Sequence, residues 1–156
     1  MKYIMSIMLA LAALNVSADE IFPAGCKAII VKDEAVKLEA AKPVIVMIHN
    51  LSSGDLWITH PVAEPSASAG WSSKLQANNW SALALSDKTF ELNCIESKPG
   101  HEQQVPCAGV LAACQWDMKS MPQGASGTYW AGEDMAISAL TAHIAGRGFE
   151  VPDASQ

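Results

Sequence analysis

From residue 27 onward, the chain is dominated by short runs in which apolar and polar residues alternate or every residue is apolar. Runs of roughly four to eight residues, rich in β-branched side chains and separated by polar turn signals, indicate β-strands. Seven segments fit this pattern: Lys27–Lys32, Val36–Ala40, Pro43–Asn50, Leu56–Val62, Trp80–Leu85, Thr89–Ser97 and Gln103–Ala108. Strands of this length and spacing predict a mainly β, sandwich-like single domain.

The segment Pro43–Asn50 (PVIVMIHN) differs from its neighbours because it is apolar at almost every position. An exposed strand would alternate between apolar and polar residues, whereas a continuous apolar run is typical of a strand that is covered on both faces. We therefore expect this strand to lie in the middle of the fold.

Helical spacing is clearest near the C-terminus. Apolar residues recur there at intervals that place them on one side of a helix: Ala136, Ile137, Leu140 and Ile144. We predict a helix over about residues 133–145. Glu133 and Asp134 would lie at its start, where negative side chains interact favourably with the helix dipole. A glycine of Gly146-Arg147-Gly148 would end it.

Residues 63–79 (AEPSASAGWSSKLQANN) interrupt the strand pattern. The segment is rich in alanine and serine but also carries apolar anchors, so it predicts a packed surface loop rather than a linker. Long structured loops on a β-scaffold often carry binding residues. The candidates are the two tryptophans that flank the loop and two polar residues near them: Trp71, Trp80, Ser72 and Lys74. The tryptophans in strand-like runs are assigned to the core: Trp57, Trp116 and Trp130.

Residues 1–18 have the pattern of a secretory signal peptide. Lys2 precedes an apolar run, Tyr3–Leu14, and Val16-Ser17-Ala18 provides small residues before a cleavage point. The run is too short to cross a bilayer. We therefore predict an exported mature domain over residues 19–156, periplasmic or secreted, with no transmembrane anchor.

Removal of this leader would leave 138 residues and change the formal net charge from −6 to −7. A chain of this length can bury a core of its own. The negative charge argues against nucleic acid as a partner.

All four cysteines lie beyond the leader, and exported thiols usually pair. A hairpin around Gly100-His101 opposes residues whose numbers add to 201, which places Cys94 across from Cys107. Cys26 and Cys114 would then form the second disulfide. The alternative pair Cys107–Cys114 would close a tight loop over six residues. The cysteine spacing does not fit a structural zinc site.

Two histidines form the strongest candidate for a metal site. A tight hairpin centred on Gly54-Asp55 would oppose residues whose numbers add to 109, which makes His49 and His60 cross-strand neighbours. Met47 lies two residues along the same face. Two imidazoles and a thioether would suit copper. The competing interpretation is that both histidines are solvated or hydrogen-bonded, since a one-residue slip places them on opposite faces.

No catalytic motif is complete. The segment Gly70-Trp71-Ser72-Ser73-Lys74 begins like the nucleophile elbow G-x-S-x-G, but Lys74 stands where the second glycine is required. Any two of the sixteen acidic residues could converge as a glycosidase pair, and the sequence singles out none. We expect a non-enzymatic protein without a cofactor, and a cell-wall-active enzyme remains an alternative.

The order of small, aromatic and cysteine residues along the mature chain resembles that of the enhanced-entry protein B (EnhB) family of Legionella-type bacteria. The matching positions are Asn50, His60-Pro61, Ser66–Leu75, Asn79–Leu85, Phe90, Cys94, Val105–Gln115 and Gly127–Trp130. The resemblance implies an exported, virulence-associated envelope protein that affects uptake into host cells. It implies no catalytic residues and no molecular mechanism.

These observations favour a disulfide-stabilised, non-catalytic binding module. Its expected partner is an envelope protein or a cell-wall or host-surface ligand. The two alternatives are a periplasmic copper-binding protein that uses His49 and His60, and a cell-wall-active enzyme.

Overall fold

The structure, a computed structural model, describes residues 22–32, 34–61, 72–86, 89–122 and 127–151. In these ranges the chain forms ten strands and one helix. They are β1 (Lys27–Ile29), β2 (Ala35–Glu39), β3 (Val44–Asn50), β4 (Leu56–Thr59), β5 (Ser72–Leu75), β6 (Trp80–Leu85), β7 (Thr89–Glu96), β8 (Gln103–Val105), β9 (Leu111–Asp117), β10 (Thr128–Met135) and α1 (Ile137–Gly146). Each of the seven predicted segments overlaps a strand; β5, β9 and β10 are additional.

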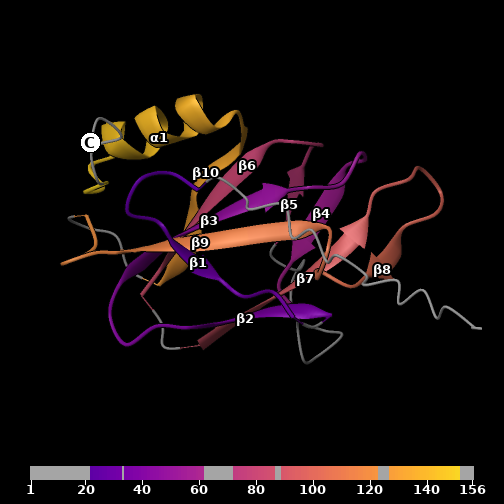
Figure 1. The fold of residues 1–156 in the computed structure, drawn as a ribbon, viewed down its shortest axis with the longest axis horizontal. Coiled ribbons are helices and arrows are strands. Elements are labelled where there is room, and N and C mark those ends of the chain that lie inside the picture. The colour runs from indigo at the N-terminus through magenta and orange to yellow at the C-terminus, as the bar shows by residue number, and fades with distance from the viewer. Residues whose placement is uncertain (1–21, 33, 62–71, 87–88, 123–126, 152–156) are drawn as a thin grey trace, which may run out of the picture.

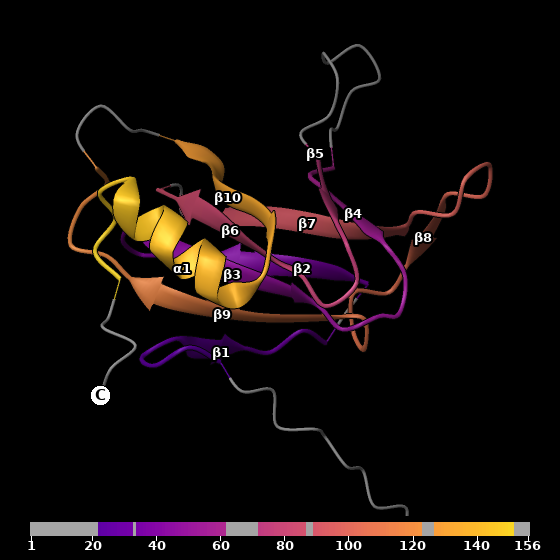
Figure 2. The ribbon, with the colours of Figure 1, turned by 90° about the horizontal axis from the view of Figure 1, so that it is seen from above.

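The strands form two antiparallel sheets that pack face to face. Sheet A has the order β1-β9-β3-β6-β10, and sheet B has the order β2-β7-β4-β5, with β8 paired to β7 as well. Helix α1 lies over sheet A, on the side away from sheet B, so the molecule has three layers (Figures 1 and 2). The prediction of a mainly β, sandwich-like fold with one C-terminal helix is confirmed.

Strand β3 lies at the centre of sheet A and is buried on both faces, as its apolar run predicts. Val44, Val46 and Ile48 point into the core between the two sheets. Ile45 and Met47 point the other way, into a second core beneath α1. Both edges of β3 are also occupied, because it pairs with β6 on one side and β9 on the other.

Helix α1 begins later than predicted. Strand β10 continues through Met135, which pairs with Trp80, and Ala136 is the N-cap of the helix. Glu133 and Asp134 therefore belong to the strand, and their predicted place at the helix N-terminus is wrong. The predicted apolar side of the helix is confirmed for Leu140 and Ile144, which are completely buried, whereas Ile137 is half-buried and Ala136 is exposed.

The C-terminus of α1 ends at a glycine, as predicted. Gly148 has a φ of +87°, in the left-handed region that glycine adopts without a steric penalty. Its N–H donates to the carbonyl of Ala145, and the N–H of Phe149 donates to that of Ile144. This pair of bonds is the Schellman arrangement. It directs Phe149 into the core under the helix, where it is buried.

Substituting Gly132 with alanine is expected to lower the free energy of unfolding by about 1–3 kcal/mol. Strand β10 passes so close beneath α1 that a Cβ at this position would collide with Leu140 Cδ1 and lie 3.2 Å from His143 Cδ2. Urea unfolding followed by circular dichroism measures the loss. The control is Gly146→Ala on the same helix, where a Cβ meets nothing within 4 Å; it is expected to be neutral or slightly stabilising. Equal stability of the two variants would contradict the close approach.

Both predicted disulfides are present: Cys26–Cys114 and Cys94–Cys107. The hairpin of β7 and β8 also forms, but Cys94 pairs in register with Val105, so the predicted register is wrong by two residues. A shift of two keeps side chains on the same face of a sheet. Cys107 therefore still reaches Cys94 from the turn that follows β8.

Two disulfides are consistent with folding in an oxidising compartment. No helix in the described ranges combines the length and hydrophobicity needed to span a membrane. The predicted signal peptide, residues 1–18, lies outside the described residues.

Candidate functional site

The hairpin proposed to bring His49 and His60 together does not form. Residues 51–55 instead carry the chain from sheet A to sheet B, because both edges of β3 are taken by β6 and β9. His49 stacks on Trp80, with ring centroids 4.2 Å apart, and His60 stacks on Phe90 in the other sheet at 4.3 Å.

The copper hypothesis therefore loses its geometric basis. Met47, the proposed third ligand, is completely buried under α1. His60 Nδ1 lies 2.7 Å from the carbonyl oxygen of Glu91, and since a carbonyl only accepts, Nδ1 is the protonated nitrogen and donates. Within the described ranges, no group of three or more His, Cys, Asp or Glu side chains is placed to hold a metal ion.

The four residues proposed around the loop have different positions. Trp71 lies outside the described residues. Trp80 opens β6 and is only 5% exposed, packed against His49 and edge-on to Phe22, so it is a core residue and its proposed role in binding is wrong. Ser72 and Lys74 lie in β5, where exposed and buried residues alternate. Because Ser73 and Leu75 are the buried ones, Ser72 and Lys74 point away from the core.

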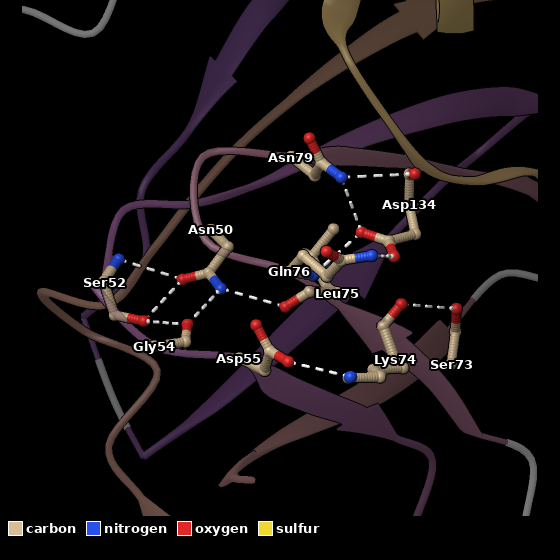
Figure 3. Close-up of polar contacts among 10 residues, drawn as sticks. All are labelled: Asn50, Ser52, Gly54, Asp55, Ser73, Lys74, Leu75, Gln76, Asn79 and Asp134. Atoms are coloured by element: carbon tan, nitrogen blue, oxygen red, sulfur yellow. Dashed lines mark hydrogen bonds and ion pairs between the residues drawn. The ribbon is translucent and has the colours of Figure 1, made fainter.

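A polar network at one end of the sandwich joins the two sheets (Figure 3). At its centre, Asn50 is completely buried and every polar atom of its side chain is used. Its Nδ2 donates to the carbonyls of Gly54 (2.8 Å) and Leu75 (2.9 Å), and its Oδ1 accepts from the backbone N–H and the hydroxyl of Ser52. Because Asn50 belongs to sheet A and Leu75 to sheet B, the side chain connects the sheets.

Asp134 extends this network toward β10. Its carboxylate accepts hydrogen bonds from the backbone N–H of Gln76 (2.8 Å), the side chain of Gln76 (2.6 Å) and Asn79 Nδ2 (2.9 Å). Its φ of 51° is left-handed, which is unusual for a residue other than glycine. These hydrogen bonds hold Asp134 in that conformation and bind the turn between β5 and β6 to the edge of sheet A. The role of Asp134 is therefore structural.

The pKa of the Asp134 carboxyl group lies below its ordinary value. Burial raises the pKa, but the hydrogen bonds from Asn79 and Gln76, with a smaller attraction from Lys74, outweigh that effect. The ionised group therefore stabilises the fold fully at any pH above its unfolded-state pKa of about 3.9. This contribution is lost as the pH falls through the lower folded-state pKa.

We expect Asp134→Asn to be less stable than the wild type near neutral pH, and the difference to shrink as the pH falls below about 4. The protonated carboxyl group of the wild type, like the amide, accepts these N–H groups less strongly than the carboxylate does. Urea unfolding at about pH 6 and about pH 3 measures the change. Glu133→Gln, an exposed neighbour, controls for net charge. A difference that stays constant with pH would contradict this assignment.

The outward side of sheet B carries a second group of polar residues, and no described element packs against it (Figure 1). Leu56 and Ile58 of β4 point into the core, so Trp57 and Thr59 point outward. We call this surface the open face; its outward side chains include Lys37, Trp57, Thr59, Lys74, Asn93, Ile95 and Gln104.

Register places these side chains in rows across the strands. Trp57 pairs with Lys74 on one side and with Ile95 on the other, and Ile95 pairs with Gln104. Lys74 also forms an ion pair with Asp55 at 2.8 Å, and this contact raises the pKa of the lysine. The open face thus contains a half-buried apolar pair, Trp57 and Ile95, with polar groups at both ends.

A groove of about 650 Å³ lies near this apolar pair and is lined by Asn93 and Gln104 rather than by the pair itself. Strands β2 and β8 follow one another along the same edge of β7, opposite β4, and the groove lies where they meet. Its lining includes Lys37, Glu91, Asn93, Gln104 and Pro106. The volume is in the range of small-ligand sites, which is roughly 300–1,000 Å³.

Sequence reasoning misses the open face because it assigns Trp57 to the core. The alternation Leu56-Trp57-Ile58-Thr59 was the available signal, since only two of these four residues can face the core of a sandwich. The groove had no comparable signal, because its residues come from three separate strands.

Comparisons of the chain with protein-family models, with curated proteins and with solved structures found no match.

Proposed function

We propose that the mature chain is an exported, non-catalytic binding module that contacts an envelope protein or a cell-wall or host-surface ligand through the open face. The resemblance to the EnhB family supports export and a role in uptake into host cells. The two disulfides support an oxidising compartment, periplasmic or extracellular.

The observation that carries this proposal is the difference between the outer sides of the two sheets. Helix α1 covers sheet A and buries a full apolar core there. The open face of sheet B instead presents Trp57 and Ile95, half-buried, beside polar side chains. A tryptophan surrounded by polar groups is typical of protein surfaces that bind partners.

The test is photocrosslinking in intact bacteria and during contact with host cells. A benzophenone amino acid is placed at Thr59, on the open face, or at Ala142, on the exposed side of α1 as a control. We expect a discrete crosslinked product from position 59 in the envelope or host-surface fraction, absent from position 142. Adding Trp57→Ala should reduce its yield at least severalfold.

Equal products from both positions would mean that the open face has no special role. An unprocessed chain that stays in the cytosol would contradict export. Either result would overturn the proposed function.

A further inference from the structure

We propose that the groove near Trp57 binds a neutral oligosaccharide that carries acetamido groups, the chemistry of β-1,4-linked N-acetylglucosamine chains. This inference rests on the proposed function, which requires a ligand on the open face but does not define its chemistry. Three properties of the groove support it: side chains without protein partners, balanced charge, and a nearby aromatic ring.

The polar side chains of the groove are not used by the protein itself. Among the described residues, no hydrogen bond or ion pair involves the side chains of Asn93, Gln104, Glu91 or Lys37. Lys37 and Glu91 are directly opposed in register and still form no ion pair. The network at Asn50 differs completely, since every polar atom of that asparagine is bonded within the fold.

These free carboxamides suit an acetamido ligand. Each carboxamide offers N–H donors and a carbonyl acceptor, so it can pair with both the carbonyl and the N–H of an acetamido group. Asn93 is already half-buried in the groove. Part of its desolvation cost is therefore incurred before a ligand arrives, and the polar atoms that still face solvent can exchange water for the acetamido group of a ligand.

The charges in the groove favour a neutral ligand. Two lysines, Lys32 and Lys37, lie among two glutamates, Glu34 and Glu91, so the formal charge of the lining is zero. An anionic or cationic ligand would meet repulsion as well as attraction. Hydroxyl groups can instead donate to the carboxylates and accept from the ammonium groups, in charge-assisted hydrogen bonds.

Trp57 supplies an apolar surface one strand away from the groove, on the same face of sheet B. Asn93 is the cross-strand partner of Thr59, so it lies diagonal to Trp57 on the same face. Gln104 lies two strands from Trp57, roughly 10 Å away at the ordinary strand spacing. The C–H groups of a sugar ring can pack on the indole while the next units of the chain reach the carboxamides. An oligomer therefore fits better than a single sugar.

The test is isothermal titration of the full mature protein with chitotetraose, the tetramer of N-acetylglucosamine. We expect binding that weakens at least tenfold in Trp57→Ala and in Asn93→Ala, and is unchanged in Ser138→Ala on the opposite side of the molecule. Cellotetraose, which has the same linkage but lacks acetamido groups, should bind at least tenfold more weakly, because a site built for a hydrogen bond rejects ligands that lack the group.

Two further arms identify the source of the sugar. Pull-down with purified peptidoglycan sacculi tests the cell wall, and binding to host glycoproteins with terminal N-acetylglucosamine tests the host surface. Binding in either arm that requires Asn93 supports the inference.

No binding of chitotetraose at millimolar concentration, or binding that Trp57→Ala and Asn93→Ala leave intact, would overturn the inference. If the crosslink at Thr59 is nevertheless present, the proposed function stands and only the sugar chemistry is wrong. Cleavage of chitotetraose that is lost in Glu91→Gln would instead support the ligand class and overturn the non-catalytic part of the proposed function.

Discussion

Removal of the Cys26–Cys114 disulfide by paired alanine substitutions is expected to lower the free energy of unfolding by about 4–5 kcal/mol. The two cysteines are 88 residues apart. In the chain-entropy model, a crosslink over a loop of this length strongly restricts the unfolded chain, and its removal restores that freedom. The bond also ties the segment before β1 to β9, the neighbour of the central strand β3 in sheet A.

The Cys94–Cys107 disulfide provides a matched comparison. Its cysteines are 13 residues apart, and the same model gives a loss of about 3 kcal/mol. Urea unfolding of both double-alanine variants, under non-reducing conditions, measures the two losses. The first variant should have the lower unfolding midpoint and the steeper dependence on urea, because the unfolded chain without its crosslink is more expanded and exposes more surface. The reverse order would show that local packing, rather than loop length, decides what each bond contributes.

The disulfide pairing was predictable even though the register on which it was based was wrong. Parity along a strand decides which side chains share a face, and an error of two residues preserves parity. Seven strands were predictable from the local pattern of apolar residues, whereas β5, β9 and β10 were missed. The continuous apolar run of β3 predicts burial on both faces of the strand, and both faces are covered.

The histidine pair shows where this reasoning fails. A tight turn signal at Gly54-Asp55 is equally compatible with a hairpin within one sheet and with a connection between two sheets. Only the strands that pair with β3 distinguish the hairpin from the connection between sheets. These strands, β6 and β9, come from distant parts of the chain. The helix boundary failed for a related reason, because hydrogen bonds from residues near 76–79 hold Asp134 in the strand.

Replacing Asn50 with alanine is the other substitution with a large expected effect, a loss of about 3 kcal/mol. The change removes four hydrogen bonds at a completely buried position. The carbonyl of Leu75 would lose the hydrogen bond that it accepts from Asn50 Nδ2. A buried polar group without a hydrogen-bond partner costs about 1–3 kcal/mol. Asn50→Asp should be worse, because it would bury a charge and direct it at two carbonyl oxygens.

Asn93→Ala is the matched control for this experiment. It removes the same type of side chain, but one that forms no hydrogen bond among the described residues, and should change the free energy of unfolding by less than about 0.5 kcal/mol. Because Asn50 connects the sheets, hydrogen exchange in Asn50→Ala should also accelerate at β4 and β5, ahead of β3. Similar losses in both alanine variants, or uniform acceleration across both sheets, would mean that this network does not join the open face to the rest of the fold. Faster exchange confined to β4 and β5 would show that one buried amide holds the strands that carry Trp57 and Lys74 in place.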